Sequence, residues 1–128
     1  LYNKLKSLYL CVSYDTDLLA IENICSFSEK WYHFIKDKKD LKIELRTKSA
    51  NIDKFLNLDV LDNFIIAFTL SPEDIALKNE KYTASFKNRV KAIKELQNKG
   101  WKVRICIDPL IYTDDFEKNY SEATYKPK

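Results

Sequence analysis

One stretch constrains the fold more than any other: residues 63–70 read Asn-Phe-Ile-Ile-Ala-Phe-Thr-Leu, an almost unbroken apolar run. A run of this length, rich in β-branched and aromatic residues, predicts a strand that is buried on both faces. Such strands are typical of parallel sheets whose faces are covered by helices. The segment therefore favours an α/β fold with a parallel sheet.

Three further segments predict strands of the same sheet. Residues 8–13 form a short apolar run, residues 41–48 alternate apolar and polar side chains, and residues 101–107 alternate again before Pro109. Helical patterns separate the four strands, and no hairpin signal such as Asn-Gly lies between them. We therefore expect right-handed β/α crossovers and four parallel strands in sequence order.

The first helix is expected to begin at residue 18, with Thr16 or Asp17 as its N-cap. Apolar residues spaced three and four apart predict its buried face, which carries Ile21, Ile24, Cys25, Trp31 and Ile35. The charged run at 36–40 ends this helix in a solvated loop.

Capping residues predict three more helices. Asn51 is expected to cap a short helix after the second strand, and Pro72 to begin another. The longest helix begins at Thr83 or Ser85 and ends at Gly100, where a left-handed C-cap is expected. The residues predicted to be buried between sheet and helices are Ile43, Leu45, Phe68, Val90, Ile93, Val103 and Ile105.

Composition excludes several classes of function. A single glycine among 128 residues excludes glycine-rich phosphate loops. The net charge of +3 is too small for the footprint of a dedicated nucleic-acid binder. Neither a charged leader nor an apolar run of about 18 residues is present, so we expect a cytoplasmic protein with no membrane segment. The lack of any methionine indicates a piece of a longer protein.

Cysteine and histidine usage predicts no metal site. Cys11, Cys25 and Cys106 lie too far apart for a short-range metal motif, and their odd number favours a reducing compartment. We expect all three to be buried as small apolar side chains. His33 has no cysteines at suitable spacing and is expected to be a packing or surface residue.

Polar side chains line one side of the second and fourth strands. They are Glu44, Arg46, Lys48, Arg104 and Asp108. One explanation is a β/α barrel: its lumen, holding a charged cofactor, solvates the polar row while helices cover the apolar side. The alternative explanation is an edge strand whose polar side faces water. An eight-unit barrel takes about 250 residues, so the four units at 8–111 amount to about half of one. A C-terminal tail is expected at 112–128.

Five segments follow one another along the chain: SYDTDLLAIENI, IELRTKSANIDKFL, FTLSPEDI, EKYTASFKNRVKAI and GWKVRICIDPLIY. Their most specific parts are Thr-Lys-Ser at 47–49, Glu80 with Thr-Ala-Ser at 83–85, and Asp-Pro at 108–109. In content and order they resemble the spore photoproduct lyase family of radical S-adenosylmethionine proteins, from about Leu8 to Tyr120. The resemblance implies a partial (β/α)6 barrel with S-adenosylmethionine and a 4Fe-4S cluster. The founding members repair a thymine dimer in DNA by radical chemistry.

The family binds its cluster through a CxxxCxxC motif after the first barrel strand, and this chain has no such triplet. The resemblance therefore implies a fragment that begins after that loop, about half of a radical S-adenosylmethionine barrel. We expect the fragment to be inactive and free of cofactor on its own, with the rest of its parent chain as partner and DNA or another nucleic acid as substrate. The alternative is a non-enzymatic α/β module that binds a protein or a nucleic acid.

The resemblance also implies site residues. Lys48 matches the family lysine that contacts the cofactor, Thr69 matches a serine with the same task, and Asp108 lies at the corresponding end of the fourth strand. Tyr14 stands where spore photoproduct lyase proper has a cysteine that returns a hydrogen atom to the product radical. This makes Tyr14 the catalytic candidate and argues against thymine-dimer repair. Strand alternation also allows Tyr14 to join Leu10 on the helix-facing side.

Two other residues match the family but have simpler explanations. Asp17 precedes Leu18, which favours helix capping. Arg89 lies on the long helix beyond the strand ends, which predicts an outer-surface or ion-pair residue outside the site. Four strands of a barrel leave two open sheet edges, so we expect the fragment to self-associate or to be supported by a partner, with the uncharged strand at 8–13 as the contact.

Overall fold

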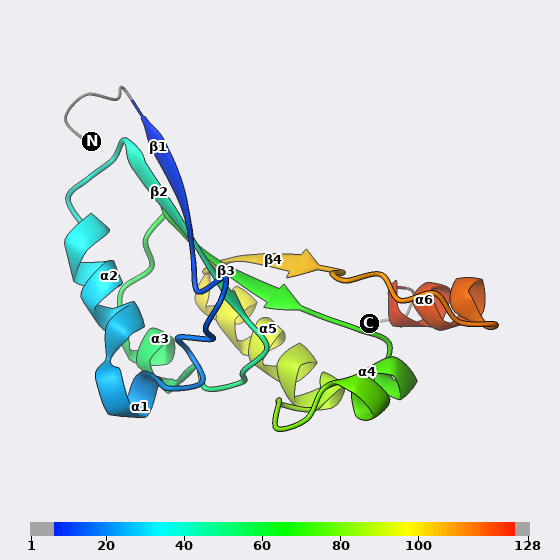
Figure 1. Ribbon diagram of the computed structural model, residues 1–128. Helices are drawn as coiled ribbons and strands as arrows, with labels where there is room; N and C mark the ends of the chain where they lie inside the picture. Colours follow the sequence, from blue (N-terminus) through cyan, green and yellow to red (C-terminus); the bar gives the residue numbers. More distant parts are fainter. Residues whose placement is uncertain (1–6, 125–128) are drawn as a thin grey trace.

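The computed structural model describes residues 7–124 and contains the expected parallel sheet (Figure 1). Its strands are β1 (Leu8–Val12), β2 (Leu41–Thr47), β3 (Phe64–Thr69) and β4 (Lys102–Cys106). Every neighbouring pair is parallel, in the order β1-β2-β3-β4. The helices are α1 (Glu22–Cys25), α2 (Phe27–Ile35), α3 (Asp53–Asn57), α4 (Glu73–Asn79), α5 (Phe86–Lys99) and α6 (Phe116–Thr124).

The helices α2, α3 and α5 lie on one face of the sheet, and no described helix covers the opposite face (Figure 1). A doubly wound sheet carries helices on both faces, whereas a β/α barrel carries them on the outside only. The sheet is therefore a section of a barrel wall, and its uncovered face corresponds to the lumen. We call this uncovered side the lumen face.

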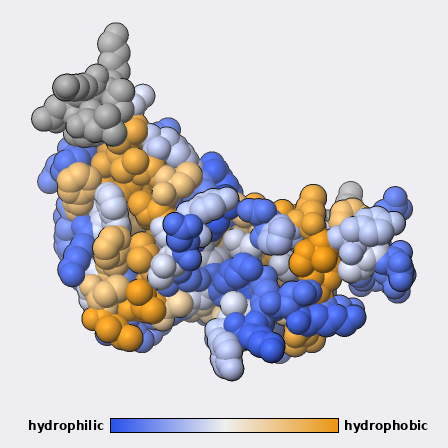
Figure 2. Space-filling view, in the orientation of Figure 1, coloured by the Kyte–Doolittle hydropathy of each residue, from blue (hydrophilic) through white to orange (hydrophobic). Residues whose placement is uncertain are grey.

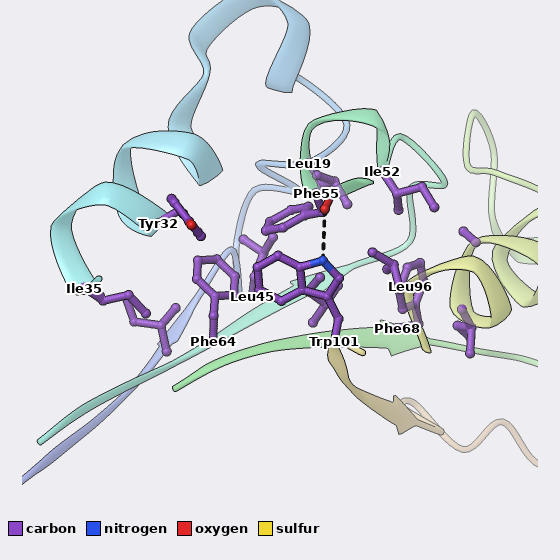
Figure 3. Packing of buried hydrophobic residues seen from close by; sticks show 14 of the residues in the cluster. Leu19, Tyr32, Ile35, Leu45, Ile52, Phe55, Phe64, Phe68, Leu96 and Trp101 are labelled. Carbon is purple, nitrogen blue, oxygen red and sulfur yellow. Dashed lines mark hydrogen bonds between the residues drawn. The ribbon is translucent and has the colours of Figure 1, made fainter. Parts of the chain in front are cut away.

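Strand alternation assigns each side chain to a face. Ile43 and Leu45 of β2 and Phe68 of β3 point to the helices and are fully buried. An aromatic cluster of Phe55, Phe64 and Trp101 fills the centre of this core (Figure 3). The Phe55 and Trp101 rings meet edge to face at 5.3 Å, and the Trp101 indole N–H donates to the Phe55 carbonyl oxygen at 2.9 Å. This bond satisfies the buried indole and ties α3 to the start of β4.

The predicted core is correct in part. Ile93 is buried with Ile43, Leu45 and Phe68, and Val90 and Val103 are half-buried against the core. Ile105 is 55% exposed, which contradicts the prediction. Its strand β4 is an edge of the sheet. Alternation alone predicts a buried face for Ile105, but burial also requires a covering element.

The helix expected from residue 18 is broken. Ser26 takes a left-handed conformation with φ 45° between α1 and α2. The buried Glu22 carboxylate accepts hydrogen bonds from the backbone N–H groups of Ser28 and Glu29, which begins α2 afresh. The break changes the phase of the helix, so Ile24 is 88% exposed. The predicted apolar stripe is therefore wrong in its first half.

The caps of α5 follow the prediction. Ser85 is its N-cap and accepts from the Asn88 N–H at 3.2 Å, and Gly100 ends it with φ 104°. Pro72 precedes α4 as expected. Asn51 is not a helix cap, because its amide donates to the Leu19 carbonyl and the Asn23 side chain instead. The tail expected at 112–128 contains α6, and its last four residues lie outside the described part.

The prediction that all three cysteines are buried is wrong. Cys11 is exposed, and Cys25 and Cys106 are half-buried. Cys11 and Cys106 alternate onto the lumen face, which no helix of the described residues covers. His33 is an exposed residue of α2, as expected. Between residues 7 and 124 no helix has the length and apolarity needed to cross a bilayer.

Candidate functional site

A polar pocket of about 340 Å³ opens at the carboxyl ends of the strands. It brings together the four residues singled out from the sequence, namely Tyr14, Lys48, Thr69 and Asp108. The remaining lining residues are Ser13, Asp15, Asp17, Arg46 and Thr47. Barrel sites are built at this end because parallel strands deliver their last residues to one edge. We call it the strand-end pocket.

The loop after β1 turns Tyr14 toward this pocket. Ser13 takes a positive φ of 67°, and its hydroxyl donates to the Thr16 carbonyl and accepts from the Leu18 N–H. Strand alternation ends at this residue, so Tyr14 does not join the helix-facing side. Its ring is 68% exposed and stacks with the Arg46 guanidinium at 5.3 Å from the ring centroid.

Asp17 ties the same loop to the end of β2. Its carboxylate accepts from the Thr47 hydroxyl at 2.8 Å and from the Lys48 backbone N–H at 2.7 Å. It also accepts from the Ala20 N–H at 3.2 Å, as the capping interpretation requires, although residues 18–21 form a turn rather than a helix. Asp17 is therefore both a local cap and a wall of the strand-end pocket.

Lys48 meets a carboxylate that the sequence analysis did not assign to the site. Its ammonium lies 2.7 Å from Glu80 Oε1, which also accepts from the Ser71 hydroxyl at 3.1 Å. Glu80 Oε2 pairs with Arg89 at 2.5 Å. Burial alone would raise the pKa of Glu80, but the hydrogen bonds from Lys48 and Arg89 outweigh it and lower this pKa below its ordinary value.

Arg89 is not an outer-surface residue, since only 2% of its side chain is exposed. It reaches from α5 to the end of β3, where it donates to the Thr69 carbonyl oxygen at 2.7 Å. The prediction that Arg89 forms an ion pair is correct, and the alternative that it lies on the outer surface is wrong. Helical periodicity placed Arg89 on a face of α5, but it gave no sign that this face meets the strand ends.

The polar row of β2 and β4 lies on the lumen face and is paired internally. The buried Glu44 carboxylate contacts Arg104, lies 3.6 Å from Arg46 and accepts from the Tyr9 hydroxyl at 2.5 Å. Arg46 reaches Asp108 at 3.1 Å. Because β2 pairs on both sides, the edge-strand alternative is wrong for this strand. Burial and the Glu44 carboxylate raise the pKa of Tyr9.

In the described part of the chain, no three histidine, cysteine, aspartate or glutamate side chains are grouped so as to hold a metal ion. The three cysteines are free thiols. Burial raises the pKa of Cys106, which keeps this thiol protonated at neutral pH. These residues do not fit a 4Fe-4S cluster, because such a cluster requires several cysteine thiolates together.

The family model for spore photoproduct lyase matches residues 9–126. The chain belongs to the spore photoproduct lyase family. The fold agrees with solved structures of spore photoproduct lyase: a cysteine-to-alanine mutant superposes with a TM-score of 0.86 at 18% identity, and a complex with dinucleoside spore photoproduct superposes with 0.85 at 19%. A double mutant with bound AdoMet and dinucleoside spore photoproduct also matches, with a TM-score of 0.85 at 19% identity.

In each of these comparisons the match covers 94% of this chain but only 36% of the solved one. The chain therefore corresponds to about a third of a spore photoproduct lyase. None of the curated proteins matches the sequence significantly.

Proposed function

We propose that this chain forms the S-adenosylmethionine-binding part of a radical S-adenosylmethionine enzyme related to spore photoproduct lyase. The observation that carries the proposal is the strand-end pocket. Lys48 at the end of β2, Thr69 at the end of β3 and Asp108 after β4 line one cavity in a chain of this family. In this proposal the enzyme is cytoplasmic.

The chemistry of the pocket suits this ligand. S-adenosylmethionine carries a carboxylate, an ammonium, a sulfonium and ribose hydroxyls. The Lys48 ammonium binds the carboxylate, and the Thr69 hydroxyl donates to or accepts from the polar groups of the methionine moiety. Asp108 supplies a carboxylate for a positive group. Held by these residues, S-adenosylmethionine would supply radical chemistry once another part of the parent protein contributed the cluster.

The cluster itself requires another part of the parent protein, because the described residues offer no ligand set for it. The remainder of the parent chain is thus the essential partner, and the chain alone is inactive and binds S-adenosylmethionine weakly or not at all. A DNA-derived molecule is the proposed substrate class, since relatives form complexes with dinucleoside spore photoproduct.

Tyr14 is the proposed hydrogen-atom donor. Its phenol stands at the pocket, 68% exposed. Transfer of the O–H hydrogen atom to a carbon radical of the product forms a C–H bond and leaves a tyrosyl radical. The Arg46 guanidinium stacked on the ring holds the phenol in place.

The test uses the full-length protein, purified without oxygen, in an iron assay, an ultraviolet–visible spectrum and an assay of S-adenosylmethionine cleavage. Lys48→Ala should reduce cleavage more than about tenfold while iron content stays unchanged. The matched control is Lys54→Ala, because Lys54 pairs with Glu29 rather than with a pocket residue. If the Lys48→Ala variant still cleaves S-adenosylmethionine at the wild-type rate, Lys48 does not belong to the site. If the wild-type protein contains no iron and cleaves no S-adenosylmethionine, the result supports the non-enzymatic module.

A further inference from the structure

A fully buried arginine lies behind the strand-end pocket. Each of the three nitrogens of Arg89 donates within the protein: Nε to the Ala84 carbonyl at 2.8 Å, one terminal nitrogen to the Thr69 carbonyl at 2.7 Å, and the other to Glu80 and to the Thr83 hydroxyl. The side chain does not line the pocket. At the strand-end pocket, Arg89 can therefore act on a ligand only through other residues.

Glu80 connects Arg89 to Lys48. Its Oε2 faces the guanidinium, and its Oε1 accepts from the Lys48 ammonium and from the Ser71 hydroxyl. Only 8% of its side chain is exposed. A carboxylate this buried stays charged because it is paired and hydrogen-bonded, so its position is set by these partners.

Lys48 is the last member of the chain of contacts. Lysine has three N–H donors, and the contact with Glu80 uses one of them. The four-carbon stem of a free lysine has many conformers, and fixing it upon binding costs entropy. An ammonium that is already held at the pocket wall avoids most of that cost.

We infer that Glu80 and Arg89 are positioning residues of the ligand site: Glu80 fixes the Lys48 ammonium, and Arg89 fixes both Glu80 and the end of β3 at Thr69. The inference rests on the proposed function, because it assigns Lys48 and Thr69 to ligand binding. A structural role in joining α4 to α5 predicts a loss of stability only. A positioning role predicts a change in Lys48 and in ligand affinity.

The experiment measures two quantities in the full-length protein. The first is the rate at which acetic anhydride modifies each lysine, followed by mass spectrometry, and the second is the dissociation constant for S-adenosylmethionine. Glu80→Gln should raise the modification rate of Lys48 several-fold and weaken binding roughly tenfold. Glu29→Gln is the control, because it breaks the Lys54 pair at 3.0 Å outside the pocket. This variant should raise the modification rate of Lys54 and leave that of Lys48 unchanged.

Glu80→Asp serves as a second variant, since it keeps the charge that Arg89 requires and withdraws the carboxylate by one methylene. It should change both quantities in the same direction by a smaller factor. Unchanged Lys48 reactivity, or faster modification with unchanged affinity, would overturn the inference. If the wild-type protein binds no S-adenosylmethionine, the proposed function fails, and the Lys48 rate still decides whether Glu80 holds this ammonium.

Discussion

Within residues 7–124, two buried carboxylates each pair with two cationic side chains, in different parts of the barrel wall. Glu44 pairs with Arg46 and Arg104 on the lumen face, and Glu80 pairs with Lys48 and Arg89 at the strand ends. Both carboxylates are almost completely removed from solvent. Breaking such a buried pair by removing one partner is costly, because the other charge is left without compensation.

Glu80 gives a prediction about acid stability. The pKa of Glu80 is lowered in the folded chain from its ordinary value of 4.5, so the carboxylate binds its proton more readily after unfolding. Its contribution to stability is therefore fully present well above pH 4.5. That contribution is lost as the pH falls through the folded pKa. At neutral pH, Glu80→Gln should cost about 2 kcal/mol of unfolding free energy.

The measurement is urea unfolding of the chain and of Glu80→Gln at a series of pH values. The difference between them should shrink as the pH falls below about 4. A difference that stays constant down to acid pH would show that Glu80 stabilises the fold through packing rather than through its charge.

At the scale of elements, the sequence predicted a helix boundary correctly where a single capping residue determines it. Ser85 and Gly100 mark the ends of α5 because a hydroxyl cap and a left-handed glycine are local requirements. The break at Ser26 was not predictable, because it depends on the buried Glu22 carboxylate capping α2 across the turn. The periodicity argument assumes one continuous helix, so the predicted apolar face continued across the break.

Gly100 allows a prediction about the stability of the end of α5. Its φ of 104° is unfavourable for residues with a Cβ, whereas the space around it is open, with Val60 as the nearest side chain at 3.8 Å. Gly100→Ala should therefore cost about 1 kcal/mol through backbone strain alone. Denaturant unfolding checks this, with Asn98→Ala in the last turn of α5 as the control, because Asn98 is exposed. An unchanged midpoint would mean that the helix end rearranges without cost.

The candidate site was predictable in its strand-end residues and not in its supporting ones. Lys48, Thr69 and Asp108 follow strands, and parallel strands deliver such residues to one edge. Glu80 and Arg89 come from a loop and a helix, whose approach to the strand ends depends on tertiary packing. Glu80 did stand among the segments that resemble the family, and that was the only signal for it.

At the scale of the whole molecule, the sheet has two edges, β1 and β4. Large apolar side chains are exposed on the helices as well as at the β4 edge, among them Ile24 of α1, Phe34 of α2 and Ile105 of β4. Figure 2 shows apolar patches toward both sides of this face of the molecule. Exposed edges recruit further strands, and charged side chains discourage this pairing. β1 has no charged side chain, whereas β4 carries Lys102 and Arg104.

We therefore expect the isolated chain to self-associate through β1 at tens of micromolar. Leu10→Lys should shift it toward monomer, and Cys11→Lys is the gentler variant, because Cys11 is exposed whereas Leu10 packs against the core. Sedimentation velocity over a concentration series measures the effect. A sharp monomer at every concentration would show that the open edge is protected.

The central claim is that the strand-end pocket binds S-adenosylmethionine in the whole protein. The most direct measurement is a crystal structure of the full-length protein grown with S-adenosylmethionine. The account predicts the ligand in this pocket, with its carboxylate on the Lys48 ammonium and its polar groups beside Thr69 and Asp108. A ligand bound elsewhere, or a pocket filled by another segment of the parent chain, would contradict it.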